Sequence, residues 1–136
     1  MIEKLRAFLL TCPFLQSPNE GLNPKIYVDY LSETPTTYQI QIVPVSKVIR
    51  KYVDGGGIKQ KTFIFRSIEV FEGKDIEQNM SNIKFFEQFS EWLEKTKPEV
   101  ANWVKVEALT DGYFFGAEDS QDKATYQIQC RIIYNF

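Results

Sequence analysis

The spacing of apolar residues changes from a period of two to a helical period and back, and this change constrains the fold of the chain more than any other feature. From Asp75 onward, apolar residues recur at every third or fourth position over about five helical turns, until Pro98 ends the pattern. Charged residues occupy the other side. The spacing predicts one long amphipathic helix with an apolar stripe of Ile76, Met80, Ile83, Phe86, Phe89, Trp92 and Leu93 and a polar face of Glu77, Lys84, Glu87, Glu91 and Glu94.

On both sides of this helix, apolar and polar residues alternate, which is typical of strands with one buried face. The alternation predicts strands over 26–31, 38–42, 47–53, 59–71, 103–108 and 126–135. Between the third and fourth of these, the run Asp54-Gly55-Gly56-Gly57 has the residues that a hairpin turn requires. Because 59–71 exceeds the usual strand of ~5–6 residues, we expect it to extend beyond the core as one arm of a long hairpin.

The helices and hairpins together predict the fold class α+β. A short apolar stripe predicts an N-terminal helix that Pro13 ends; its members are Ile2, Leu5, Phe8 and Leu9. Because hairpins rather than crossover helices join the strands, we expect one mostly antiparallel β-sheet, flanked by the N-terminal helix and the long central helix. The length of 136 residues predicts a single domain spanning 1–136.

The residue types that support common catalytic sites are missing. Without histidine, the chain cannot build His-dependent triads, His-containing metal sites or the usual base near neutral pH. It also lacks the glycine-rich phosphate loops, the nucleophile elbow and a Cys-x-x-Cys pair. We interpret Cys12 and Cys130 as buried thiols of a protein in a reducing compartment. We therefore expect no enzyme, no cofactor and no bound metal.

Two other classes of function are left open by the residues alone. An enzyme would need two carboxylates with raised pKa in one cleft, and the candidates are Glu69, Glu72 and Asp75, or Glu87, Glu91 and Glu94. A small-ligand-binding module would show an apolar pocket with a few converging polar groups.

The net charge of −2 gives no reason to expect specific binding to nucleic acid. No apolar run approaches the ~20 residues of a membrane span, and the apolar run 7–10 is too short for a secretion signal. We therefore expect neither nucleic acid nor a membrane among the partners.

Charge is distributed unevenly along the chain. Six basic residues and one acidic residue lie in 47–66, a balance of +5, whereas seven acidic and two basic residues lie in 69–94, a balance of −5. One interpretation is two independent solvated surfaces. The other is a heterologous contact, in which the basic hairpin of one copy meets the acidic helix of the next. The candidate interface residues are Lys47, Arg50, Lys51, Lys59, Lys61 and Arg66 on the hairpin and Glu87, Glu91 and Glu94 on the helix.

Aromatic residues make up 15% of the chain, which is more side-chain area than one small core easily hides. Three of them, Tyr113, Phe114 and Phe115, follow the predicted Asp111-Gly112 turn and precede Gly116. We include these three aromatic residues among the candidates for an interface with another subunit.

Six blocks of the sequence resemble those of a known family. They are MIEKLRAFLLTCPFL at 1–15, IYVDYL at 26–31, KYVDGG at 51–56, NMSNIKFFEQFSEWLE at 79–94, VEALTDGYFF at 106–115 and ATYQIQCRIIYN at 124–135. In their order and spacing they are similar to small proteins of tailed bacteriophages and prophages, the minor capsid or tail terminator-like proteins. The similarity covers nearly the whole chain, and no block is a catalytic signature.

The resemblance implies a structural virion protein at the head-to-tail junction, assembled in the cytoplasm of the host bacterium. Tail terminators form rings, commonly hexameric, that cap the completed tail tube and present a surface to the head. The implied partners are other copies of the chain, the tail tube protein and the head-tail connector protein. The implied fold, a sheet flanked by helices, agrees with the class predicted above. Another head-tail joining or minor capsid component is the alternative that the resemblance leaves open.

Overall fold

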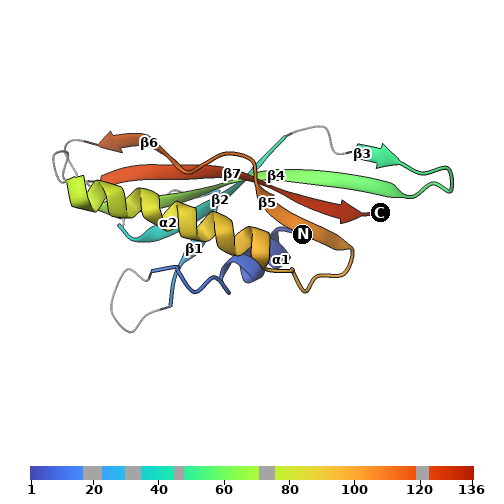
Figure 1. Ribbon diagram of the computed structural model, residues 1–136, viewed down its shortest axis with the longest axis horizontal. Coiled ribbons are helices and arrows are strands. Elements are labelled where there is room, and N and C mark those ends of the chain that lie inside the picture. The colour runs from blue at the N-terminus through green and yellow to red at the C-terminus, as the bar shows by residue number, and fades with distance from the viewer. Residues whose placement is uncertain (17–22, 30–34, 45–47, 71–75, 119–122) are drawn as a thin grey trace.

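The computed structural model describes residues 1–16, 23–29, 35–44, 48–70, 76–118 and 123–136. These residues form two helices and a mixed sheet of seven strands, which confirms the α+β class (Figure 1). In chain order the elements are α1 (Ile2–Leu9), β1 (Ile26–Val28), β2 (Thr37–Val43), β3 (Val48–Lys51), β4 (Gly57–Val70), α2 (Ile76–Lys95), β5 (Trp103–Ala108), β6 (Tyr113–Glu118) and β7 (Lys123–Asn135).

The sheet is built on a long central pair of antiparallel strands. Strands β4 and β7 stay in register from Ile58 opposite Asn135 to Val70 opposite Lys123. Strands β2 and β3 both pair with the other edge of β4, and strands β5 and β6 both pair with the other edge of β7. Strand β1 pairs with β2 in parallel, whereas the other pairings among the described strands are antiparallel. The sheet is therefore mixed, with its parallel pair at one edge.

The predicted hairpin joins β3 to β4. Tyr52 N–H donates to the carbonyl of Gly56 at 2.7 Å, and Gly55 adopts a φ of 93°, a conformation that favours glycine. The turn of this hairpin lies at one end of the long axis of the molecule, and the first turns of α2 lie at the other (Figure 1).

Strand β6 shows where the sequence pattern was misleading. The alternation of apolar and polar residues indicates strands elsewhere but gives no signal over 113–118, where the structure contains β6. Consecutive aromatic residues hide the period of two, and the pairing of β6 with β7 shifts between Phe114 and Gly116. A shift of this kind marks a bulge, which changes the side of the strand from which the following side chains project.

Both helices pack on one face of the sheet, and aromatic side chains fill the space between them. Phe65 of β4 stacks on Tyr38 of β2 and on Phe89 of α2, with ring centroids 5.4 and 4.6 Å apart. Phe8 of α1 stacks on Trp92 of α2 at 5.1 Å, which places α1 beside the C-terminal half of α2. Of the five alternating residues predicted to share one face of the last strand, Tyr126, Ile128, Cys130 and Ile132 are buried in the same core and Tyr134 is half-buried against it.

The long helix is confirmed, but its predicted apolar stripe is wrong in the first two turns. Ile76 and Met80 are 71% and 65% exposed, and Asn82 is buried in their place. The amide nitrogen of Asn82 donates to the carbonyl of Val70 at 3.5 Å, and its amide oxygen accepts from Gln78 at 3.0 Å. These hydrogen bonds turn one side of α2 toward the sheet, so Ile76 and Met80 face solvent. The side turned toward the sheet carries Gln78, Asn82, Phe85, Phe89 and Leu93.

The face of the sheet opposite the helices, called the open face below, is covered by neither described helix. Residues that alternate with the core positions of β4 and β7 project from it. They form rows across the strands, of which Gln39–Arg66–Gln127 and Thr62–Arg131–Glu107 are two. The open face is therefore rich in glutamine and arginine side chains.

Gly112 allows the chain before β6 to pass close to α2. We therefore predict that Gly112→Ala lowers the free energy of unfolding by about 1–3 kcal/mol. A Cβ at this position would lie 2.3 Å from the Cβ of Phe86, which cannot withdraw without moving the helix backbone. Gly116→Ala is the matched control, because a Cβ there meets no atom within 4 Å. Urea denaturation measures both variants, and equal losses would contradict the prediction.

Candidate functional site

The predicted basic segment does not form one surface. Because β4 alternates, Lys59 and Lys61 project from the same side as the buried Phe63 and Phe65, whereas Arg66 projects from the open face. On β3, Arg50 lies opposite Ile58 and Lys51 lies opposite Gly57, which places these two side chains on different sides as well. Lys47 lies outside the described residues. The described basic residues are thus divided between the two faces of the sheet.

Aromatic rings hold two of the hairpin cations in place. The Arg50 guanidinium lies 5.7 Å from the ring centroid of Tyr52, and the Lys59 ammonium lies 4.3 Å from that of Phe136. Contacts of this kind orient a cation without neutralising it. The hairpin therefore keeps its positive charge at the surface.

The predicted acidic face of α2 is present and exposed. Glu87, Glu91 and Glu94 follow one stripe of the helix at spacings of four and three residues. The ion pairs between described residues are Lys105–Glu107 and Arg131–Glu107, at 3.0 and 2.6 Å. Neither the described basic residues of 47–66 nor the three glutamates of α2 take part in them. Within the described chain, the two opposite charge sets therefore do not compensate each other.

The three consecutive aromatic residues of β6 are exposed but serve both faces of the sheet. Phe114 packs edge-to-face on Tyr126 at 5.6 Å and lies beside Ile83 of α2. Phe115 is 59% exposed, and the Arg66 guanidinium lies over its ring at 5.4 Å on the open face. The hydroxyl of Tyr113 accepts a hydrogen bond from the Gln127 amide on that same face. Tyr113 and Phe115 thus belong to the open face, and Phe114 belongs to the helix side.

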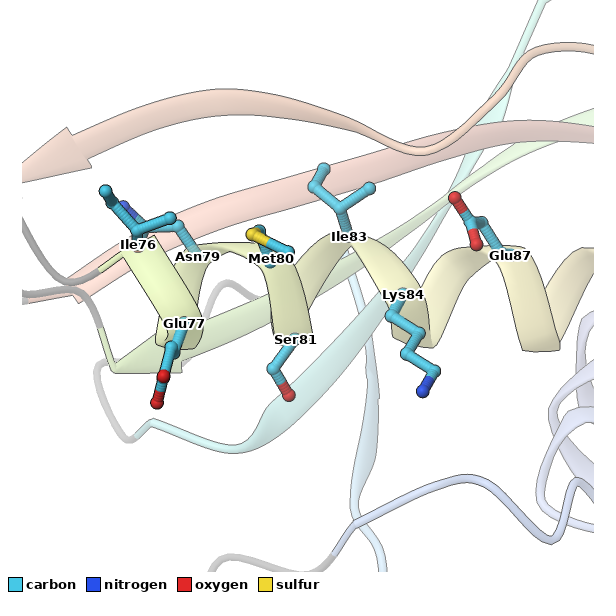
Figure 2. A pocket seen from close by; sticks show the side chains of 8 residues that line it. All are labelled: Ile76, Glu77, Asn79, Met80, Ser81, Ile83, Lys84 and Glu87. Atoms are coloured by element: carbon cyan, nitrogen blue, oxygen red, sulfur yellow. The ribbon is translucent and has the colours of Figure 1, made fainter.

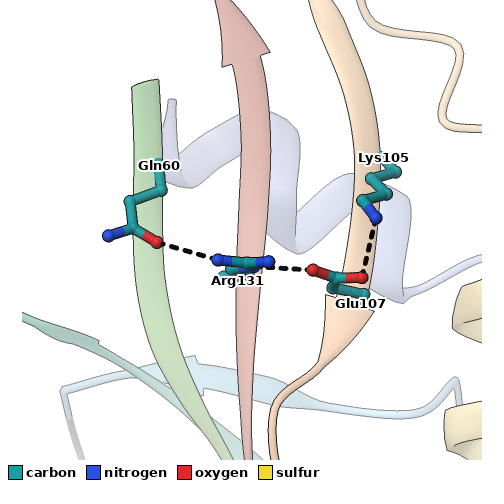
Figure 3. Close-up of polar contacts among 4 residues, drawn as sticks. All are labelled: Gln60, Lys105, Glu107 and Arg131. Carbon is teal, nitrogen blue, oxygen red and sulfur yellow. Dashed lines mark hydrogen bonds and ion pairs between the residues drawn. The ribbon is translucent and has the colours of Figure 1, made fainter. Parts of the chain in front are cut away.

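Charge and apolar spacing along the sequence do not predict the open face as a site, although the sequence carries a signal for it. The sequence Gln-Ile-Gln occurs at 39–41 and again at 127–129, and in both strands the glutamines project from the open face. Figure 3 shows a second polar chain on this face, in which the Arg131 guanidinium donates to Glu107 at 2.6 Å and to Gln60 at 3.3 Å. Lys105 pairs with the other oxygen of Glu107.

This chain of contacts keeps Glu107 ionised. Its partial burial acts to raise the pKa of the carboxyl, but hydrogen bonds and charge from Lys105 and Arg131 outweigh burial and lower it. The carboxylate is thus the counter-ion of two cations. No such carboxylate serves Arg66 among the described residues.

A concavity of about 810 Å³ follows the first three turns of α2. Its described lining comes from α2 alone, and Figure 2 shows Ile76, Met80 and Ile83 pointing to one side while Glu77, Ser81 and Lys84 point to the other. A small-ligand site needs polar groups that converge on an enclosed space. This concavity is instead an open helix surface with exposed apolar side chains.

The titratable groups with raised pKa lie in the core. Burial raises the pKa of Glu69 to about 7, and this carboxyl lines none of the described cavities. The alternative acid–base partners Glu72 and Asp75 lie outside the described residues. Burial also raises the pKa of the Cys12 and Cys130 thiols, which disfavours the reactive thiolate.

Two further observations concern metals and membranes. The described residues contain no group of three or more histidine, cysteine or acidic side chains that could hold a metal ion. Within the same residues, neither helix has the length and apolar character needed to cross a membrane.

The chain matches no protein-family model, and no curated protein matches it at a significant level. Function is therefore inferred from the sequence resemblance and from the surfaces described above.

Proposed function

We propose that the chain is a structural protein of a tailed phage or prophage virion, a tail terminator that assembles into a ring, caps the tail tube and helps to join tail to head. The resemblance of the six sequence blocks supplies the class. The observation that carries the proposal concerns the described basic residues of 47–66 and the glutamates of α2, which leave each other unpaired within the described chain. Arg50, Lys51 and the three glutamates are exposed, and Lys59, Lys61 and Arg66 are half-buried.

Opposite charges that do not meet within one copy favour a contact between copies. Such a contact is heterologous, because one copy offers the basic segment and the next offers α2. Repetition of a heterologous contact closes a ring when the rotation between neighbours permits it. A ring of this kind presents one rim to the tail tube protein and the other to the head-tail connector. Another head-tail joining component would use the same contact.

The proposal predicts that reversing the acidic stripe of α2 prevents self-association. Glu87→Lys combined with Glu91→Lys and Glu94→Lys places three cations opposite the basic segment of the neighbour. We expect the concentration of half-association to rise by about 100-fold or more, which corresponds to about 2.7 kcal/mol. Sedimentation velocity at rising protein concentration measures the effect, and added salt should weaken wild-type association as well.

The matched control reverses three exposed acidic residues that lie off this helix stripe, Glu3, Glu99 and Asp111. This variant has the same net charge as the α2 variant and should associate like the wild type. An α2 variant that assembles as well as the control would refute the proposed contact.

A further inference from the structure

The open face presents two arginines in contrasting settings. Arg131 has a carboxylate partner, Glu107, and its neighbouring cation Lys105 shares that partner (Figure 3). Arg66 lies on the same face, one row of glutamines away, and has amide partners instead. The charge of Arg131 is therefore compensated within the chain, and that of Arg66 is not.

Three glutamines fix the Arg66 guanidinium in position. Its Nε donates to the amide oxygen of Gln127 at 2.8 Å, and its Nη1 donates to those of Gln39 at 3.0 Å and Gln41. The ring of Phe115 covers the guanidinium at 5.4 Å. Burial lowers the pKa of Arg66, as expected for a cation held partly out of water without a counter-ion. The guanidinium is thus oriented before any partner binds.

The remaining hydrogen-bonding groups around Arg66 are donors. A guanidinium only donates, so each glutamine must direct its amide oxygen toward Arg66 and its amide nitrogen away. The nitrogen of Gln127 donates to Tyr113, whereas within the described chain no acceptor faces Nη2 of Arg66 or the amide nitrogens of Gln39 and Gln41. A fixed set of donors with one uncompensated positive charge fits a carboxylate.

The ring geometry selects which carboxylate. In a closed ring whose axis runs along the strands, neighbours are related by rotation without translation along that axis, so a residue meets residues at its own height in the next copy. Arg66, Gln127 and Tyr113 lie opposite one another in one row across three strands. In the next row, Phe114 and Tyr126 lie beside Ile83 of the same copy. Among the three glutamates of the acidic stripe, Glu87 is the one nearest to Ile83 along α2, one turn beyond it, and in Figure 2 it points to the same side as Ile83.

Apolar side chains support the same pairing. Ile76 and Met80 are exposed on α2 near Ile83, and Phe115 is exposed on the open face beside Arg66. Both described helices cover one face of the sheet, and neither covers the open face (Figure 1). Copies that stack in one direction therefore bring α2 of one copy onto the open face of the next. The contact then buries these apolar side chains around the ion pair.

We propose that the open face of each copy receives α2 of the neighbouring copy and that Arg66 binds the carboxylate of Glu87 there. This inference rests on the proposed self-assembly and adds the face and the residue pair that make the contact. The helix-side cations Lys59 and Lys61 lie outside it.

A double-mutant cycle tests the pair. Arg66→Gln and Glu87→Gln should each raise the concentration of half-association by about tenfold or more, and the double variant should be no weaker than either single one. Arg131→Gln is the matched control, since Glu107 already compensates that arginine, and we expect a change below about threefold. Arg66→Lys keeps the charge but loses the guanidinium geometry and should fall between Arg66→Gln and the wild type.

Three results would overturn the inference. They are additive losses in the double variant, equal losses in the Arg66 and Arg131 variants, and a larger effect of Lys59→Glu with Lys61→Glu than of Arg66→Gln. The third result would agree with ring assembly but would show that the contact uses the helix side of the hairpin instead of the open face. Failure of the three-glutamate α2 variant to affect association would instead refute the proposed function. The midpoint of thermal unfolding is measured for each variant as a control. A midpoint equal to that of the wild type shows that the variant is folded and that its loss concerns association.

Discussion

Replacing Phe89 with alanine will lower the free energy of unfolding by about 3–5 kcal/mol, the largest loss that we expect from one side chain of this protein. Phe89 is 0% exposed, and its ring stacks on Phe65 at 4.6 Å and lies 5.9 Å from Phe85 and 6.1 Å from Trp92. It joins α2 to the centre of the sheet. Its removal leaves a cavity that the surrounding rigid rings cannot close.

Urea denaturation followed by tryptophan fluorescence and circular dichroism measures this loss. Phe14→Ala is the control, because Phe14 is an exposed aromatic residue of the same type, and we expect it to cost about 1 kcal/mol or less. A loss for Phe89→Ala below about 1.5 kcal/mol would show that the aromatic cluster does not anchor α2.

The second large effect that we expect depends on pH and on one buried carboxyl. Glu69 is 7% exposed on the helix-covered side of β4, and burial raises its pKa from 4.5 to about 7. The folded state thus binds the proton more tightly than the unfolded state. Its stabilising contribution is complete below pH 4.5 and is lost as the pH rises toward 7. At about 1.4 kcal/mol per pKa unit, the loss is about 3 kcal/mol.

Glu69→Gln removes this dependence, because the amide stays neutral at every pH. The variant should match the wild type near pH 4.5 and exceed it in stability by about 3 kcal/mol near pH 8. Glu94→Gln is the matched control for the same exchange at an exposed position of α2. Parallel pH profiles of the wild type and Glu69→Gln would contradict the assignment of Glu69 as a buried carboxyl with a raised pKa.

Local patterning predicted most of the fold. The long helix, the hairpin turn at Asp54 and the buried face of β7 each follow from an uninterrupted period of apolar residues, and the structure contains all three. Strand β6 was missed because its pairing contains a bulge, and a bulge breaks the period on which the prediction depends. The orientation of the first turns of α2 was missed because hydrogen bonds of Asn82, rather than apolar spacing, determine it.

The candidate site was predicted less well, because charge along a sequence does not specify a face. The six basic residues look like one patch in 47–66, but strand alternation divides the described ones between two sides of the sheet. The setting of Arg66 depends on side chains from three other strands, Gln39, Gln127 and Phe115. Contacts between strands so distant in the chain have no signature in local spacing.

We propose that copies of this chain associate head to tail, and the mass of the wild-type protein in solution is the measurement that decides it. Sedimentation velocity from micromolar to millimolar concentration should show a transition from the 15.9 kDa monomer to one assembly whose mass is a fixed multiple of 15.9 kDa and stops growing, as a closed ring requires. A protein that stays at 15.9 kDa throughout this range would refute head-to-tail association.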